Sequence, residues 1–141
     1  TKAAGDLMRP WITGDLWGVY PHWETMFTYR PDFEERLQPL RKFIEDYGGR
    51  PRNVHDFALI AEYNDLVSDE MVLDKALVGR PEDIVEQIIR IADTGIQEIT
   101  LYPLPLPNQD IETVLSIFFE DIQPRVEAAL RSQSLSSRTD R

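Results

Sequence analysis

The feature that most constrains the fold is a helix that runs through a glycine turn into strand-forming residues. Pro81 suits the first position of this helix, because its missing N–H would have no partner within the helix there. Glu82 and Asp83 place negative charge at the positive end of the helix dipole. Gly95 ends the helix, and residues 96–102 contain Ile, Thr and Tyr, which favour strands. A helix, a tight turn and a strand form half of a β-α-β unit and predict a parallel sheet.

The chain after this predicted strand is rich in proline. Residues 101–107 read LYPLPLP, and proline donates no hydrogen bond to a β-ladder, so we expect this stretch to leave the sheet as a stiff loop. Asn108 or Asp110 is expected to cap a final helix. Residues 131–141 are polar and rich in Ser and Arg, which indicates a disordered tail.

Two further segments precede the glycine-turn helix. Residues 32–47 carry apolar side chains at spacings of three and four, which predicts an amphipathic helix with a bend at Pro39. Residues 54–67 hold a short apolar run that fits a helix or a strand. Ser68 is expected to cap a short helix after it.

The first 31 residues are rich in aromatic side chains. They hold all three tryptophans, Trp11, Trp17 and Trp23, together with Tyr20. One interpretation is a helix docked on the rest of the protein. The other is a helix or loop that covers a substrate pocket.

Composition excludes several classes of function. The net charge is −10, from 25 acids against 15 bases, and no basic stripe with interleaved aromatics is present, so we expect no nucleic-acid partner. No apolar run is long enough to predict a membrane span. The chain has no cysteine, which excludes thiolate metal sites and fits a cytoplasmic location. The two histidines and the acids form no metal-binding motif, so we expect no metal.

A single strand cannot close a parallel sheet. Its unpaired edge would also be an aggregation hazard. We therefore expect this chain to be part of something larger, or to associate with further copies that complete a sheet.

The residues between positions 76 and 127 resemble a known family. The run ALVGRPEDIVEQIIRIADTGIQEITLYPL is similar to the C-terminal signature of luciferase-like monooxygenases and their deazaflavin-dependent relatives. The run DIETVLSIFFEDIQPRV resembles the closing helix of that family. Arg80 stands where the family commonly has Thr or Ser as a helix cap. The positions that carry the resemblance are Gly79, Pro81, Glu82, Asp83, Gly95, Glu120, Pro124 and Arg125.

The resemblance implies an α/β fold, the C-terminal fragment of a (β/α)₈ TIM barrel. Residues 96–102 would then be the eighth strand, and most or all of the first seven strands would be missing. Residues 1–130 would belong to one barrel domain, with the aromatic-rich segment 1–31 at its start and the best family match over 76–130. Such barrels hold the ring of FMN or of a deazaflavin coenzyme at the carboxyl ends of their strands.

Four residues are candidates for the site. His22 is a candidate acid or base, because histidine titrates near neutral pH. Tyr20 and Trp23 are candidates for stacking on a substrate or cofactor ring. Tyr102 would lie at the carboxyl end of the predicted strand, where it would reach the barrel mouth. Each of them also fits a packed or surface position without a ligand.

These expectations combine into one function and one alternative. The resemblance implies part of an oxidoreductase that uses reduced flavin or deazaflavin for hydride transfer to, or monooxygenation of, a small organic substrate. We expect this chain alone to be inactive, and to form a homo-oligomer or to associate with the missing part of the barrel. The alternative is a non-enzymatic helical module that associates through its Trp-rich N-terminal segment.

Overall fold

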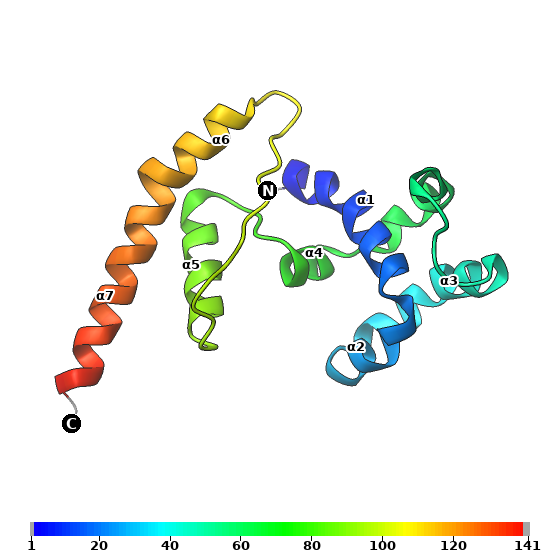
Figure 1. Ribbon diagram of the computed structural model, residues 1–141, viewed down its shortest axis with the longest axis horizontal. Coiled ribbons are helices and arrows are strands. Elements are labelled where there is room, and N and C mark those ends of the chain that lie inside the picture. The colour runs from blue at the N-terminus through cyan, green and yellow to red at the C-terminus, as the bar shows by residue number, and fades with distance from the viewer. Residues whose placement is uncertain (1, 140–141) are drawn as a thin grey trace. The chain divides into compact units, whose positions relative to one another are not determined.

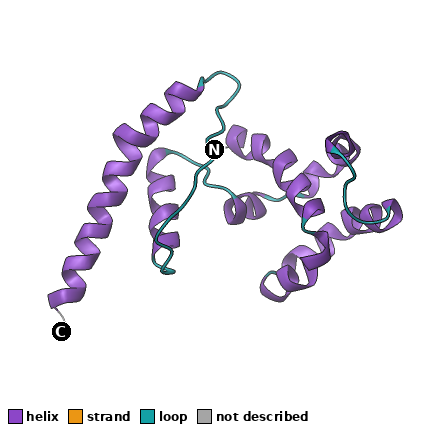
Figure 2. Ribbon diagram, viewed as in Figure 1, coloured by secondary structure: helices purple, strands orange, loops and turns teal. Residues whose placement is uncertain are grey.

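Helices and loops make up the whole of the described chain. The computed structural model describes residues 2–139, and Figures 1 and 2 show helices joined by loops, with no strand in this range. The chain divides into two compact units. One spans Gly5–Ala76, which we call the N-terminal unit. The other combines the first residues of α1 with the chain from Leu77 onward, and we call it the C-terminal unit.

The expected barrel fragment is therefore wrong for this chain. Residues 96–102, predicted as the eighth strand of a (β/α)₈ barrel, lie in the loop between two helices. A strand needs a neighbour to satisfy its backbone N–H and C=O groups. The other candidate strand, in residues 54–67, instead folds as a 3₁₀ helix. With neither neighbour nor sheet, strand propensity alone does not produce a strand.

Six helical elements build the N-terminal unit. Each of the expected helices in this part is present, and the short α4 begins directly after Ser68, whose Oγ accepts a hydrogen bond from the N–H of Met71 at 3.2 Å. The elements are α1 (Lys2–Gly18, in this unit from Gly5 onward), η1 (Tyr20–His22), α2 (Trp23–Tyr29), α3 (Asp32–Tyr47), η2 (Val54–Leu66) and α4 (Asp69–Lys75).

Tryptophan packing forms the centre of this unit. Trp17 is fully buried, and its indole meets Phe43, Tyr47 and Phe57 edge-on, at centroid distances of 5.1 to 5.9 Å. Its Nε1 donates a hydrogen bond to the carbonyl of Gly49 at 2.6 Å. The indole thus packs in the apolar core and also hydrogen-bonds to the turn after α3. The aromatic-rich N-terminal segment folds as α1, η1 and α2, and it contributes Trp17 and Trp23 to the core of this unit.

Two prolines lie inside helices of this unit. Pro39 sits within α3, which continues unbroken from Asp32 to Tyr47, and Pro10 sits within α1. Because proline has no N–H, α3 lacks one backbone hydrogen bond at Pro39. The burial of four apolar side chains on the face of α3 that meets the core outweighs this loss. These four are Phe33, Leu37, Leu40 and Ile44.

The C-terminal unit packs one helix against a long composite helix. The elements are α5 (Pro81–Ala92), α6 (Ile111–Ile117), the π-helical turn η3 (Phe118–Ile122) and α7 (Gln123–Thr139). As predicted, Pro81 begins α5, Gly95 follows its end, and Asp110 caps α6 by accepting a hydrogen bond from the N–H of Thr113 at 2.7 Å. The core is small and consists of Val85, Ile88, Ile122 and Val126, with Leu77, Ile84, Ile89, Phe118 and Leu130 packed around it.

The composite helix changes its winding just before a proline. The π-helical turn η3 ends two residues before Pro124. A wider turn relieves the clash that the ring would make with the preceding carbonyl. The disordered tail expected from residue 131 is helical up to Thr139 within the described residues, because no glycine or proline follows Pro124 to end α7. Residues 140 and 141 lie outside the described range.

The tryptophan core leads to a stability prediction. Trp17→Ala removes a fully buried indole and its hydrogen bond, so we expect a loss of about 3–5 kcal/mol in the free energy of unfolding. Trp11→Ala, at a site 57% exposed, should cost less than about 1 kcal/mol. Urea unfolding followed by circular dichroism measures both changes. Equal losses would contradict the assignment of Trp17 to the centre of the core.

Candidate functional site

The sequence candidates fall in both units. His22, Tyr20 and Trp23 belong to η1 and α2 of the N-terminal unit, whereas Tyr102 lies in the loop between α5 and α6 of the C-terminal unit. Within the N-terminal unit, Tyr20 and Trp23 are in ring contact, edge-on, with centroids 5.4 Å apart.

Trp23 is part of the hydrophobic core. Only 2% of its surface is exposed, and its Nε1 donates a hydrogen bond to the carbonyl of Leu16 at 2.8 Å. The ring also meets Phe27 edge-on at 5.8 Å. The indole therefore has no face open to a ligand in this structure, and of the contacting pair only Tyr20 reaches solvent.

Tyr20 belongs to a network of charged side chains. Its hydroxyl donates to Glu45 Oε1 at 2.8 Å, and Arg41 Nε donates to the same oxygen at 3.2 Å. Arg41 also reaches Glu24 at 2.9 Å. The hydrogen bond to Glu45 raises the pKa of Tyr20, and the hydrogen bonds from Tyr20 and then Arg41 lower the pKa of Glu45. The network therefore favours a neutral phenol and an ionised carboxylate.

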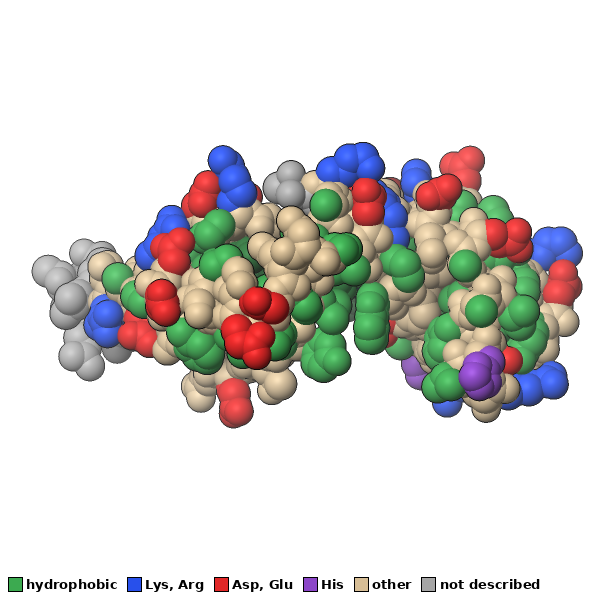
Figure 3. All heavy atoms as spheres, turned by 90° about the horizontal axis from the view of Figure 1, so that it is seen from above, with side chains coloured by type: hydrophobic (Ala, Val, Ile, Leu, Met, Phe, Trp, Pro, Cys, Tyr) green, Lys and Arg blue, Asp and Glu red, His purple; other side chains and the backbone are tan. Residues whose placement is uncertain are grey.

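His22 lies at the surface beside this network. It ends η1 and is exposed, and histidine side chains are visible as purple spheres at the surface in Figure 3. Within residues 2–139, no hydrogen bond or ion pair of its imidazole is found. A general base is normally held in place by a second group, and the structure places no such group on His22.

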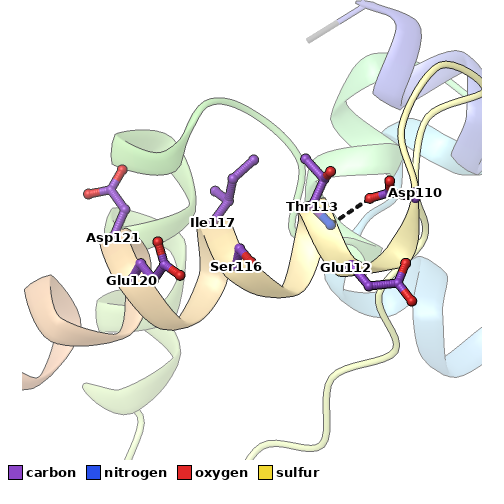
Figure 4. Close-up of a pocket in the computed structure, with 7 residues that line it drawn as sticks. All are labelled: Asp110, Glu112, Thr113, Ser116, Ile117, Glu120 and Asp121. Carbon is purple, nitrogen blue, oxygen red and sulfur yellow. Dashed lines mark hydrogen bonds between the residues drawn. The ribbon is translucent and has the colours of Figure 1, made fainter.

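A groove that the sequence candidates do not include runs along α6 and η3. It has a volume of about 500 Å³ and is drawn in Figure 4. Its lining residues come from one helical stretch and from the cap before it, so the groove is a surface feature of one element. The lining residues are Asp110, Glu112, Thr113, Ser116, Ile117, Glu120 and Asp121.

Two rows of side chains border the groove. Figure 4 shows Thr113, Ile117 and Asp121 along one side of the helix, and the other row contains Glu112, Ser116 and Glu120. Spacings of four residues place the members of each row on one face, and this spacing is a signal that the sequence already contained. In the part of the chain that the structure describes, no group of three or more His, Cys, Asp or Glu side chains is arranged to hold a metal ion.

The carboxylates decide what this groove can bind. Four acids line it, and of these Asp110 is engaged as the helix cap and Asp121 pairs with Arg125 at 3.3 Å. The hydrogen bonds from Thr113 lower the pKa of Asp110 and keep it ionised. An anionic phosphate, such as that of FMN, would meet like charge here. The groove therefore does not fit a phosphate-bearing flavin.

Comparisons with known proteins leave the family open. No protein-family model, no curated protein and no solved structure matches the chain. In addition, no helix among residues 2–139 is both long enough and apolar enough to cross a membrane.

The Tyr20 network gives a prediction that titration can test. Tyr20→Phe removes the hydroxyl that stabilises ionised Glu45, so the pKa of Glu45 should rise toward its ordinary value. Because the folded pKa is lowered, this interaction stabilises the fold above the ordinary pKa, and the contribution is lost as pH falls through the folded value. Carboxyl ¹³C shifts recorded by NMR between pH 2 and 7 measure the change.

Tyr29→Phe is the matched control for this titration. Tyr29 is 79% exposed and lies in α2 of the same unit. Its replacement should leave the Glu45 curve unchanged. If the titration curve of Glu45 is also unchanged in Tyr20→Phe, the hydrogen bond from Tyr20 to Glu45 is absent in solution.

Proposed function

We propose that this chain is a component of an oxidoreductase that uses reduced flavin or deazaflavin. In this proposal the enzyme transfers a hydride to a small organic substrate or monooxygenates it, in the cytoplasm, and the chain is inactive alone. The proposal rests on the resemblance of residues 76–127 to the C-terminal part of luciferase-like enzymes. It does not rest on a barrel, which the helical structure excludes for the described residues.

The geometry of the matching residues supports this resemblance. Gly79 has φ +143°, a conformation open to few other residues, and a Cβ there would lie 2.6 Å from the Cβ of Asp83. The Asp83 carboxylate accepts a hydrogen bond at 2.9 Å from the N–H of Arg80, the position at which the family has Thr or Ser, and so fixes the turn that leads into α5. Gly95 has φ +90°. Gly79, Asp83 and Gly95 thus each have a physical reason to be where they are.

A buried glutamine joins the motif to the helix core. Gln87 is 7% exposed, and its amide donates to the carbonyls of Val78 and Asp83 at 2.9 and 3.0 Å. Its Oε1 accepts from the N–H of Val78 at 3.3 Å. Gln87 therefore binds both the N–H and the C=O of Val78, which fixes the backbone before α5.

The cofactor fit limits what the chain does by itself. A bound flavin or deazaflavin supplies the redox chemistry in enzymes of this type, and the protein orients the ring and shields it from water. Here Tyr102 offers a ring that is 79% exposed, but the acidic groove of the same unit does not accept the cofactor phosphate. We therefore assign phosphate binding and water exclusion to protein surface outside this chain, and ring contact to Tyr102.

A titration of the purified chain with FMN and with a deazaflavin coenzyme tests this assignment. We expect no tight, stoichiometric change in the visible spectrum, and a weak change at millimolar cofactor that Tyr102→Ala abolishes. Tyr29→Ala is the matched control, because that ring is equally exposed at 79% in the other unit. Tight stoichiometric binding would show that the chain holds a complete site. A weak change that persists in Tyr102→Ala would remove Tyr102 from the cofactor contact.

A second candidate function is the non-enzymatic interaction module. The observation that favours it is the number of large apolar side chains at the surface, some of which appear as green patches between the acids in Figure 3. In the Trp-rich N-terminal segment, Trp17 and Trp23 are buried in their own unit, whereas Trp11 is 57% exposed. Exposed apolar residues of the C-terminal unit are Ile96, Ile99, Leu101, Leu115, Ile117 and Phe119.

A further inference from the structure

The loop between α5 and α6 has an unusual surface. All six residues from Ile96 to Leu101 are exposed, including Ile96 at 51%, Ile99 at 39% and Leu101 at 38%. Figure 2 shows this part of the chain as a long loop. Apolar side chains with strand propensity are seldom left in water along a whole segment, because nothing then offsets their hydration cost.

The backbone of this segment is also without partners. Among the described residues, no hydrogen bond joins the N–H or C=O groups of residues 96–101 to other backbone or side-chain groups. The nearest backbone hydrogen bonds are those of Gly95 to Ala92 and of Gln109 to Leu106. A row of unused donors and acceptors is what a strand edge presents to another chain.

The ends of the segment fix the length that could pair. Gly95 turns the chain away from α5 with φ +90°. Prolines at 103, 105 and 107 lack the N–H that a ladder needs. Residues 96–102 remain, which is the usual length of a strand.

A second copy of this chain can pair with the segment in an antiparallel register centred on Ile99. With Ile99 opposite Ile99 of the second copy, Gln97 stands opposite Leu101 and Glu98 opposite Thr100. One face of the ribbon then holds Gln97, Ile99 and Leu101 of both copies, with the two Ile99 side chains at its centre. The neighbouring symmetric register, centred on residue 98, would place Glu98 directly opposite Glu98 of the second copy, and like charges in that position are destabilising.

We propose that residues 97–101 form an antiparallel, two-stranded contact between two copies of this chain, centred on Ile99. The contact turns a loop of the single chain into a paired strand, and both copies contribute the same residues, as twofold symmetry requires. Two-stranded ribbons are marginal in water and each copy carries a charge of −10, so the dimer is weak and salt strengthens it. The proposal does not depend on flavin.

Single cysteines test the register directly, because the chain has none of its own. Across a symmetric antiparallel pair, only the central residue meets its own copy at the Cα separation that a disulfide requires. We expect Ile99→Cys to form a disulfide dimer at least tenfold faster than Gln97→Cys or Leu101→Cys under mild oxidation. Leu73→Cys, on α4 at a site 55% exposed, is the control for random collisions.

Sedimentation equilibrium of the wild-type chain completes the test. Its mean mass should rise with concentration, and Ile99→Pro, which removes one backbone donor, should keep the chain monomeric while its helical circular dichroism is unchanged. Equal crosslinking at all four cysteine positions, or a monomer at every concentration, would overturn the proposal. These experiments contain no flavin, so neither result bears on the proposed oxidoreductase function, which the titration with FMN and deazaflavin tests separately.

Discussion

The pairing requirement of the peptide backbone governs how this chain folds. A helix satisfies its N–H and C=O groups within one segment, whereas a strand depends on a neighbour. Each described segment that can close its own hydrogen bonds as a helix does so, including the 13-residue 3₁₀ helix η2. Residues 96–101, which lie between Gly95 and a series of prolines, form neither a helix nor a strand in the single chain and stay as an exposed loop. The helical architecture and the exposed segment therefore share one cause.

Local signals in the sequence predicted local structure well. Ser68, Pro81, Gly95 and Asp110 all take the helix-end positions that their chemistry favours, since a cap depends only on residues a few positions away. The stripe of α3 likewise predicted its buried face. The predicted sheet was wrong because strand formation is a property of at least two segments, and the composition of residues 96–102 contains no information about the second.

The candidate site could be predicted only in part. The sequence placed Trp23 near Tyr20 but did not distinguish a buried indole from a ligand-binding one, because both occur in aromatic-rich segments. The partner of Tyr20, Glu45, lies 25 positions away on another helix, and nothing local indicates such a contact. The acidic groove was recognisable in principle from the four-residue spacing of Glu112, Ser116 and Glu120. The π-helical turn beside it has no comparable sequence signal apart from Pro124.

Residues 96–101 are an unpaired loop in the single chain. Backbone ¹³C chemical shifts and amide exchange of these residues, recorded by NMR on a dilute sample, measure this property directly. We predict shifts close to random-coil values and exchange close to the rate of an unstructured peptide. Strand-like shifts together with slow exchange in a monomer would show that the segment pairs within its own chain, and would contradict the account.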